Sequence, residues 1–409
     1  SMGNACIVIM GSDPATSSNS VFNMHGGVIE NCSRAVTVDS GATFHMLSGE
    51  IKDCWVNGDS VISVNDGSKF IMDGGTISGR DGRWGSGLYA KNQSTITISG
   101  GTISGCKAPS SDKGNGSGLY ANHSTIKITG GTISGCEGRW GGGLYAENSS
   151  TIEISGGTIS GCKVGAGGGL FVDSSTIRIS GGTINGCVTS DTGNGGGLYA
   201  YNSTLNITGG TIKDNKAAHG GGVALIGKTT FEKPITNWTV IGNEAYATGG
   251  VGGGIKLENG SMDVSAGSNR IYNNTADGHG ADIFLLNDSS TIKLPNAANM
   301  YHDSSINIDG WYEDNPRYTP SKDGKAVTSL QLSGPLSLVA SYKASPVRIE
   351  IDTNGGVGGS VSQTVQKGTT VPVEAPIKEG YLFKGWKDDK GNSYPAGADG
   401  KVNITDNED

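Results

Sequence analysis

Proline, aromatic side chains and long apolar runs are scarce in this 409-residue sequence, whereas glycine supplies 70 residues. No run approaches the roughly 18 apolar residues that a membrane helix needs, so we expect no membrane insertion. The net charge of −8, without a basic stripe, argues against nucleic acid as a partner. Collagen is excluded because proline is scarce and glycine does not recur at every third position.

Motifs for catalysis and metal binding are also missing. The six histidines share no spacing, and the sequence contains neither a serine nucleophile elbow nor a His-Glu-x-x-His string. The cysteines never form a Cys-x-x-Cys pair, which argues against a zinc site. We therefore expect no cofactor and no bound metal.

One repeat dominates the sequence from about residue 20 to about residue 285. The string Gly-Gly-Thr-Ile recurs at steps of 26, 30, 26, 25 and 28 residues. Between its copies lie two further strings, Gly-Leu-Tyr-Ala and Ser-Thr-Ile-x-Ile, so each period carries three short β-type segments and glycine-rich corners. The copies begin at Gly74, Gly100, Gly130, Gly156, Gly181 and Gly209.

Three short strands per period predict one coil of a right-handed parallel β-helix, an all-β solenoid. Recurrent glycine and the lack of an i, i+3, i+4 apolar stripe disfavour helix. Some ten coils stacked at about 4.8 Å would extend over about 45–50 Å. Alternation within strands predicts that Leu88 and Ala90 point inward and that Tyr89 and Lys91 point outward.

This region resembles the polymorphic outer-membrane protein repeats and the glycine-rich β-helix modules of bacterial surface proteins. The resemblance rests on Gly-Gly-Gly-Leu-Tyr at 141–145 and 195–199, and on Asn-x-Ala turns such as Asn215-Lys216-Ala217. It implies the fold more strongly than a function, because such repeats occur in adhesins, autotransporters and carbohydrate-active enzymes.

Six of the seven cysteines follow the Gly-Gly-x-Ile core at one offset. They occupy one position of the coil and are expected to form a stacked ladder of reduced, half-buried thiols. Disulfides between adjacent coils are an alternative, although parallel side chains suit the disulfide torsion poorly. A protein rich in thiols would suit an anaerobic habitat. The six residues are Cys32, Cys54, Cys106, Cys136, Cys162 and Cys187.

A different domain begins near Pro346. Its strings Asp-Thr-Asn-Gly-Gly at 352–356 and Glu-Gly-Tyr-Leu-Phe-Lys-Gly-Trp at 379–386 resemble the internalin-B-type (Listeria–Bacteroides) repeat, a small β-grasp-like module of Gram-positive surface proteins. That family normally adds a final apolar strand after the position of residues 403–405, which is expected to be missing here. The predicted domains are a β-helix at 1–290, a cap and degenerate β module at 291–345, and this repeat at 346–409.

Two groups of charged residues repeat on the outer faces. Glu147 and Asp173 occupy matching positions on adjacent coils, about 5 Å apart, and are the best candidates for the two acids of a glycosidase. Solvated surface acids are the simpler interpretation. Lys127, Glu153 and Arg178 form a ladder of alternating sign on another face, which we interpret as structural pairing across strands.

Aromatic and arginine residues favour a binding role. The aromatic ladder, which comprises five outward residues on consecutive coils, is a candidate surface for sugar faces or protein contacts. Gly-Arg-Trp-Gly occurs at Arg83-Trp84 and again at Arg139-Trp140, and these two residue types are enriched at interface hot spots. Stacking that only stabilises the coil is the alternative. The aromatic ladder consists of Tyr89, Tyr120, Tyr145, Phe171 and Tyr199.

These patterns predict a secreted or wall-attached surface protein of a gut Gram-positive bacterium. We expect a monomeric adhesin-like protein that binds host glycan, mucin or a glycoprotein such as an immunoglobulin. A carbohydrate-active enzyme, either lyase or glycosidase, and a structural stalk are the alternatives. The opening Ser1-Met2-Gly3 resembles residues left by cloning, so targeting and anchoring signals are expected to lie outside this chain.

Overall fold

The computed structural model describes most of the chain between residues 5 and 293, and shorter stretches after it. Within the described ranges every regular element is a strand, and no helix there is long and apolar enough to span a membrane. The ranges are 5–11, 20–55, 60–80, 87–108, 115–286, 290–293, 306–313, 329–331, 336–344, 346–349, 352, 357, 363–366, 370–379, 384–387, 393–395 and 401–405.

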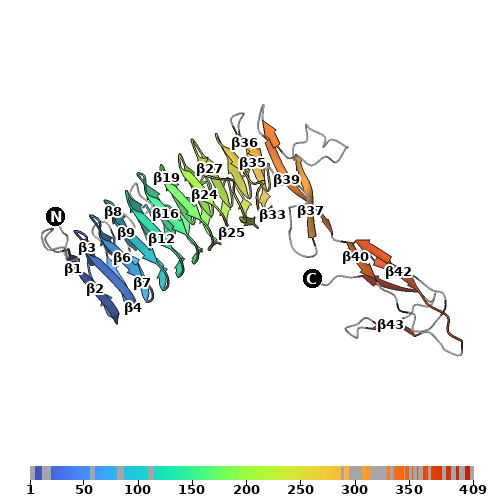
Figure 1. Ribbon diagram of the computed structural model, residues 1–409, viewed down its shortest axis with the longest axis horizontal. Coiled ribbons are helices and arrows are strands. Elements are labelled where there is room, and N and C mark those ends of the chain that lie inside the picture. The colour runs from blue at the N-terminus through green and yellow to red at the C-terminus, as the bar shows by residue number, and fades with distance from the viewer. Residues whose placement is uncertain are drawn as a thin grey trace. The chain divides into compact units, whose positions relative to one another are not determined.

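Parallel strands from successive coils stack into three long sheets, which confirms the predicted all-β parallel β-helix (Figure 1). The first sheet takes one strand from each coil. Its parallel strands are β1 (Ala5–Met10), β3 (Arg34–Asp39), β5 (Ile62–Val64), β8 (Leu88–Lys91), β11 (Leu119–Asn122), β15 (Leu144–Glu147), β19 (Leu170–Asp173), β23 (Leu198–Tyr201), β27 (Val223–Ile226), β31 (Ile255–Leu257) and β35 (Ile283–Leu285).

The second sheet takes two strands from most coils, because the chain bends at the Gly-Gly pair and continues. Its strands are β2 (Val21–Glu30), β4 (Thr43–Trp55), β6 (Lys69–Met72), β7 (Thr76–Arg80), β9 (Thr95–Ile98), β10 (Thr102–Ser104), β12 (Thr125–Ile128), β13 (Thr132–Ser134), β16 (Thr151–Ile154), β17 (Thr158–Ser160), β20 (Thr176–Ile179), β21 (Thr183–Asn185), β24 (Thr204–Ile207), β25 (Thr211–Lys213), β28 (Thr230–Phe231), β29 (Thr239–Ile241) and β33 (Arg270–Tyr272).

The third sheet begins in the middle of the β-helix and its strands are short. They are β14 (Glu137–Trp140), β18 (Lys163–Ala166), β22 (Val188–Thr189), β26 (Lys216–Ala217), β30 (Glu244–Ala245) and β34 (Thr275–Ala276). Each connects the corner after the Gly-Gly-x-Ile segment to the first sheet of the next coil.

Identical residues stack on each other because the repeat keeps its register. Leu119 pairs with Leu88 on one side and Leu144 on the other, and Ile126 pairs with Ile96 and Ile152. These inward residues are fully buried, whereas their β-branched neighbours on the outer face favour the strand conformation. The core is therefore a set of aliphatic columns that run through the coils.

Glycine is required at the bend within the second sheet. Gly157 has φ +77°, and a Cβ placed there would lie 2.6 Å from the Gly130 carbonyl oxygen of the preceding coil. An L side chain would meet both a disfavoured backbone conformation and a backbone atom of the neighbouring coil. The glycine pairs that mark the repeat are thus a consequence of stacking tight bends.

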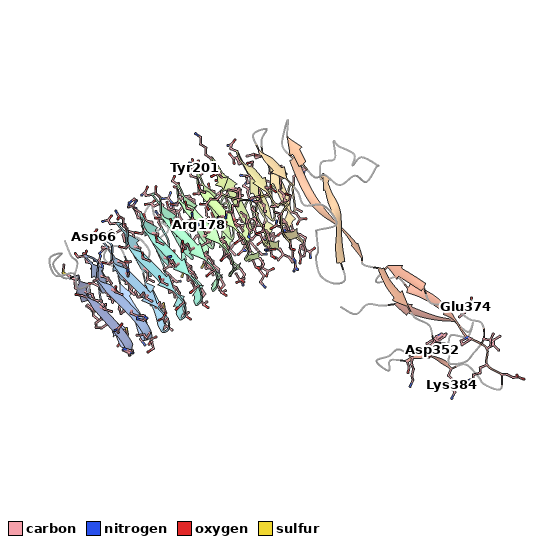
Figure 2. The ribbon with its side chains drawn as sticks, in the orientation of Figure 1. Asp66, Arg178, Tyr201, Asp352, Glu374 and Lys384 are labelled. Atoms are coloured by element: carbon pink, nitrogen blue, oxygen red, sulfur yellow. A yellow bond between two sulfur atoms is a disulfide. The ribbon has the colours of Figure 1, made fainter. Side chains whose placement is uncertain are left out.

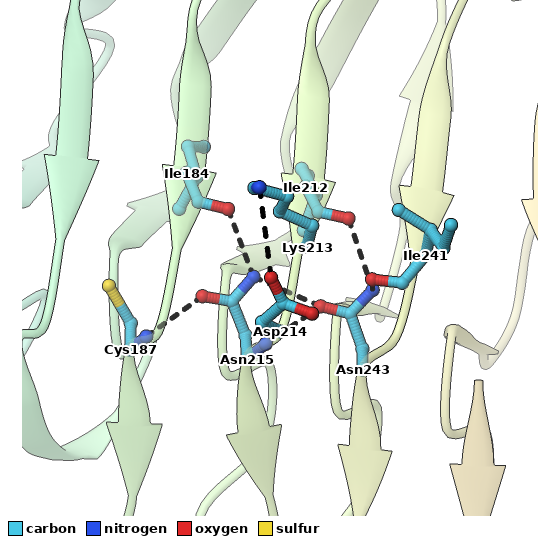
Figure 3. A network of polar contacts seen from close by, with 8 residues as sticks. All are labelled: Ile184, Cys187, Ile212, Lys213, Asp214, Asn215, Ile241 and Asn243. Atoms are coloured by element: carbon cyan, nitrogen blue, oxygen red, sulfur yellow. Dashed lines mark hydrogen bonds and ion pairs between the residues drawn. The ribbon is translucent and has the colours of Figure 1, made fainter. Parts of the chain in front are cut away.

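The cysteine column continues as a column of asparagines along the same edge of the core. The Sγ of Cys187 lies 3.5 Å from the carbonyl oxygen of Asn185, two residues earlier, and the amide nitrogen of Asn243 makes the equivalent contact with Ile241 at 3.1 Å. Each asparagine also accepts the backbone N–H of the preceding coil, as Asn215 does from Cys187 at 2.9 Å (Figure 3). The thiol and the carboxamide therefore both contact the backbone carbonyl group two residues earlier in the chain.

The cysteines of this column are not linked to one another. The expectation of a reduced thiol is wrong for Cys32, which forms a disulfide with Cys6 outside the column. The other five are free, as expected, but fully buried rather than half-buried; they are Cys54, Cys106, Cys136, Cys162 and Cys187. Contact with the Cys106 thiol, together with burial, raises the pKa of Cys136. A protonated, buried thiol is a poor nucleophile.

We expect five thiols to react in the denatured, unreduced protein and seven after reduction. In the native state they should react slowly, because all five are buried and the reagent cannot reach them. Titration with a chromogenic disulfide reagent, with and without denaturant, measures both values. Three or fewer reactive thiols in denaturant would show that ladder cysteines pair with each other.

Two antiparallel additions follow the last coil. β39 (Leu336–Ala344) pairs with β35 through residues 336–338. β38 (Ser329–Gln331) pairs with β36 (Thr291–Lys293), which itself pairs in parallel with β32 (Ser261–Asp263). The reversal of direction ends the parallel stacking. A further strand, β37, covers Ile306–Glu313. The chain divides into two compact units, Ser1–Asn299 with Gly310–Ala340, and Met300–Asp309 with Ser341–Asp409.

Among its described residues, the second unit has three pairs of antiparallel strands and an antiparallel bridge between Val357 and Ile377. The strand pairs are β40 (Pro346–Ile349) with β41 (Gln363–Gln366), β42 (Thr370–Glu374) with β45 (Lys401–Thr405), and β43 (Gly385–Lys387) with β44 (Ser393–Pro395). The segment at 401–405 thus forms a paired strand of this module. The expected lack of a further strand beyond it concerns residues 406–409, which fall outside the described residues.

Candidate functional site

The aromatic ladder lies at one register position of the first sheet. Its rings form a continuous series from Tyr89 to Tyr199 with neighbouring centroids 4.6 to 5.3 Å apart, and they are stacked except for the tilted contact between Tyr145 and Phe171. Thr37 and Ser63 occupy the position before the ladder, and Ala224 occupies it afterwards. The five aromatic residues occupy consecutive coils, but the predicted confinement of aromatic residues to these coils is wrong, because Phe284 occupies the same position after Lys256.

The predicted exposure of this ladder is wrong for its three middle rings. Tyr120, Tyr145 and Phe171 retain only 2%, 5% and 7% of their surface, whereas Tyr89 and Tyr199 are half-buried. Each middle ring is covered by a ring on either side, because the coil spacing of about 4.8 Å is close to the centroid separation of a packed aromatic pair. The ladder is a small hydrophobic cluster on the outer face of the first sheet, separate from the aliphatic core. Its accessible parts are the two end rings and the ring edges.

Glu147 lies beside the hydroxyl end of the ladder. Its carboxylate accepts hydrogen bonds from the hydroxyls of Tyr120 and Tyr145 and from Asn122, the last two at 2.9 and 2.7 Å. Burial, followed by the hydrogen bond with Glu147, raises the pKa of Tyr120 above its usual range. These tyrosines therefore stay protonated and act as donors to the carboxylate.

The two candidate acids of a glycosidase have different surroundings. Their strands β15 and β19 are paired neighbours, as the repeat predicts. Glu147 is held by donors on two coils, whereas Asp173 accepts a hydrogen bond from the adjacent Ser174 at 2.9 Å. A carboxylate held this firmly serves to orient the tyrosines, so the contacts support a structural role for Glu147 and the catalytic role stays a prediction.

Arg139 and Trp140 form the Arg–Trp corner beside the ladder. Trp140 packs against Phe171 with ring centroids 5.5 Å apart, and the Arg139 guanidinium lies 5.1 Å from the centre of the Trp140 ring. Both side chains are half-buried. The Trp140 ring is thus held by its packing against Phe171 of the ladder and by a cation–π contact with Arg139. Arg83 and Trp84, the matching pair of the sequence, lie outside the described residues.

A buried lysine beyond the ladder was missed by the sequence analysis. Lys256 follows Ala224 at the ladder position and is only 9% exposed. Its ammonium lies 3.4 Å from the Asn194 amide oxygen and 3.6 Å from the Glu258 carboxylate. The sequence could have revealed this position, because Lys256 follows Gly-Gly-Gly-Ile at 252–255 as the ladder tyrosines follow Gly-Gly-Gly-Leu at 141–144 and 195–198.

The charged ladder of the second sheet is confirmed in part. Lys127 and Glu153 form an ion pair of 3.0 Å between adjacent coils. Arg178 makes its ion pair two coils further on, with Glu232 at 2.7 Å, and Asn206 on the coil between them donates to the same carboxylate at 2.8 Å. Arg178 lies about midway along the stack of coils (Figure 2).

Two families match different parts of the chain. The family model of the right-handed β-helix region matches residues 61–244 and 117–298, and that of the Listeria–Bacteroides repeat domain matches residues 349–407. The narrower resemblance to polymorphic outer-membrane protein repeats is not tested by these matches. No curated protein and no solved structure matches the chain. Both matched modules are typical of surface or secreted proteins.

Proposed function

Because the chain belongs to the right-handed β-helix family and carries a Listeria–Bacteroides repeat, we propose that it is an extracellular adhesin-like protein of a Gram-positive bacterium. Its β-helix binds a host glycan, mucin or a glycoprotein such as an immunoglobulin. The ligand contacts the Arg–Trp corner together with the accessible edges of Tyr89 and Tyr199. The repeat module acts as a spacer.

The observation that carries this proposal is the fixed position of Trp140. Its ring is held between Phe171 and the Arg139 guanidinium and is half-buried, so that part of it stays accessible. A rigid aromatic side chain loses little conformational entropy on binding, so more of its contact energy appears as affinity. Tryptophan and arginine are also the residue types that most often dominate binding energy at protein interfaces.

A glycan array and a pull-down with host secretions identify the ligand, and Trp140→Ala then tests the site. We expect affinity to fall by at least about tenfold, because one anchor residue usually carries that much of the binding energy. Trp140→Phe should keep the packing on Phe171 and lose less. Binding is measured by surface plasmon resonance well below the melting temperature of each variant.

The matched control is Phe22→Ala, which removes an aromatic side chain that is 38% exposed on the second sheet. It should bind as the parent protein does. If Trp140→Ala binds equally well while staying folded, the corner is not the binding site. If the array and the pull-down yield no ligand at all, the stalk interpretation replaces the adhesin.

A further inference from the structure

The second sheet carries a groove that the adhesin surface does not include. It has a volume of about 370 Å³, within the range of small ligand sites. Its lining consists of the outward residues on β12, β16, β20 and β24, the hydroxyl residues that directly follow these strands, and Ile154, Ile179 and Lys233. The hydroxyl residues are Thr129, Ser155, Ser180 and Thr208.

The sequence explains why this groove is regular. Each hydroxyl residue precedes a Gly-Gly pair, so it occupies the same place in every coil, directly before the bend of the second sheet. Since neighbouring coils are about 4.8 Å apart, the hydroxyls repeat at that spacing along the axis of the β-helix. A ligand that contacts all of them must therefore be an extended chain that runs along the axis.

The charge of the groove differs in sign from that of the protein. Lys127, Arg178 and Lys233 contribute three positive charges to the lining and Glu153 contributes one negative charge, so the lining carries +2 in a chain of net charge −8. Including Glu232, which pairs with Arg178, still leaves +1. A positive groove on an acidic protein favours anionic ligands over neutral ones.

The geometry points to a binding site for a linear anionic polysaccharide, whose carboxylate or sulfate groups meet Lys127, Arg178 and Lys233 while its hydroxyls meet the serine–threonine row. Asn206, which also lines the groove, supplies a further polar contact. The site is separate from the Arg–Trp corner, because the groove belongs to the second sheet and the corner to β14 of the third. Several weak contacts along one polymer combine through avidity.

Binding of immobilised polysaccharides by biolayer interferometry at physiological ionic strength tests this site. The probes are dextran sulfate, hyaluronan as the carboxylate polymer, and neutral dextran. We expect one or both anionic polymers to bind at least about tenfold more tightly than dextran, and the preferred polymer then identifies sulfate or carboxylate as the recognised group. Equal binding of all three would overturn the proposal.

Variants separate this groove from general charge attraction. Arg178→Gln/Lys233→Gln should weaken binding of the preferred polymer by about tenfold, and Lys127→Gln/Lys233→Gln, which leaves the Arg178–Glu232 pair intact, should do the same. Glu153→Gln should strengthen binding by about threefold, because it removes the carboxylate from the lining. The control Lys163→Gln/Lys228→Gln removes the same charge from two exposed lysines outside the groove and should change binding by less than about twofold.

Two results would contradict the groove as the site. One is an equal loss of affinity in the control and the Arg178/Lys233 variant, which would indicate attraction by net charge alone. The other is unchanged binding in both groove variants. Trp140→Ala should leave polysaccharide binding at the groove intact, so a failure of the adhesin surface and a failure of this site are distinguishable.

Discussion

Replacing Asn243 by alanine is expected to lower the free energy of unfolding of the β-helix by about 3–5 kcal/mol. Asn243 is fully buried, and its amide nitrogen donates to the carbonyl oxygens of Ile212 and Ile241, both at 3.1 Å. Its Oδ1 accepts from the backbone and the side-chain amide of Asn215, both at 3.0 Å (Figure 3). Alanine would leave several of these groups buried without a partner, and each such group costs about 1–3 kcal/mol.

The measurement is urea unfolding followed by far-ultraviolet circular dichroism. The matched control is Asn185→Ala, which removes an asparagine from the outer face of β21, where it is half-buried, and should change stability by less than about 0.5 kcal/mol. Asn243→Cys should fall between the two, at about 1–2 kcal/mol, because a thiol in this column contacts the same type of carbonyl. If Asn243→Ala unfolds as Asn185→Ala does, the column has no special role in stability.

The position of this column was predictable from the sequence, but its continuity was not recognised. Cys187 follows Gly181 by the same offset as Asn215 follows Gly209, so both residues occupy one place in the coil. Interpreting the cysteines as a thiol ladder and the asparagines as turn residues separated two halves of one feature. Cysteines and asparagines in this column contact the same type of backbone carbonyl group. This common role is visible only when the backbone groups around them are located.

The fold itself was predictable because the repeat encodes it locally. Strings such as Thr95-Ile96-Thr97-Ile98 specify a strand, its inward face and, through repetition, the residue on which each side chain stacks. The pairing at the end of the β-helix could not be predicted from the repeat. β39 pairs with β35 across a sequence gap of about fifty residues without any repeated motif, and such a pairing depends on which partner covers the last coil.

The candidate site was predicted in position but not in exposure. Alternation correctly places Tyr120 and Tyr145 outside the aliphatic core, but it does not report what covers an outward side chain. The covering groups are other outward side chains, namely the neighbouring rings, Trp140 and the residues around Glu147. Burial of an outward residue therefore depends on the coils above and below it, and a single strand pattern contains no such information.

This difference leads to the second large effect, which is expected at Tyr145. Tyr145→Ala should destabilise the protein by about 3–5 kcal/mol, the usual cost of truncating a buried aromatic residue. The ring lies between Tyr120 and Phe171, with centroids 5.3 and 5.1 Å away, so alanine would open a cavity bounded by two rings. Tyr145→Phe removes only the hydroxyl that donates to Glu147 and should cost about 1 kcal/mol.

Tyr199→Ala shows how much of the effect depends on having an aromatic ring on both sides. Tyr199 ends the ladder, with Phe171 at 4.6 Å on one side and the small Ala224 on the other, so its loss should cost about half as much as that of Tyr145. Thermal and urea unfolding of all three variants measure the order. If Tyr145→Ala keeps the stability of the parent protein but loses ligand binding, the middle rings are a contact surface after all. If it unfolds readily while Trp140→Ala stays folded and loses the ligand, the ladder supports the site and the corner forms it.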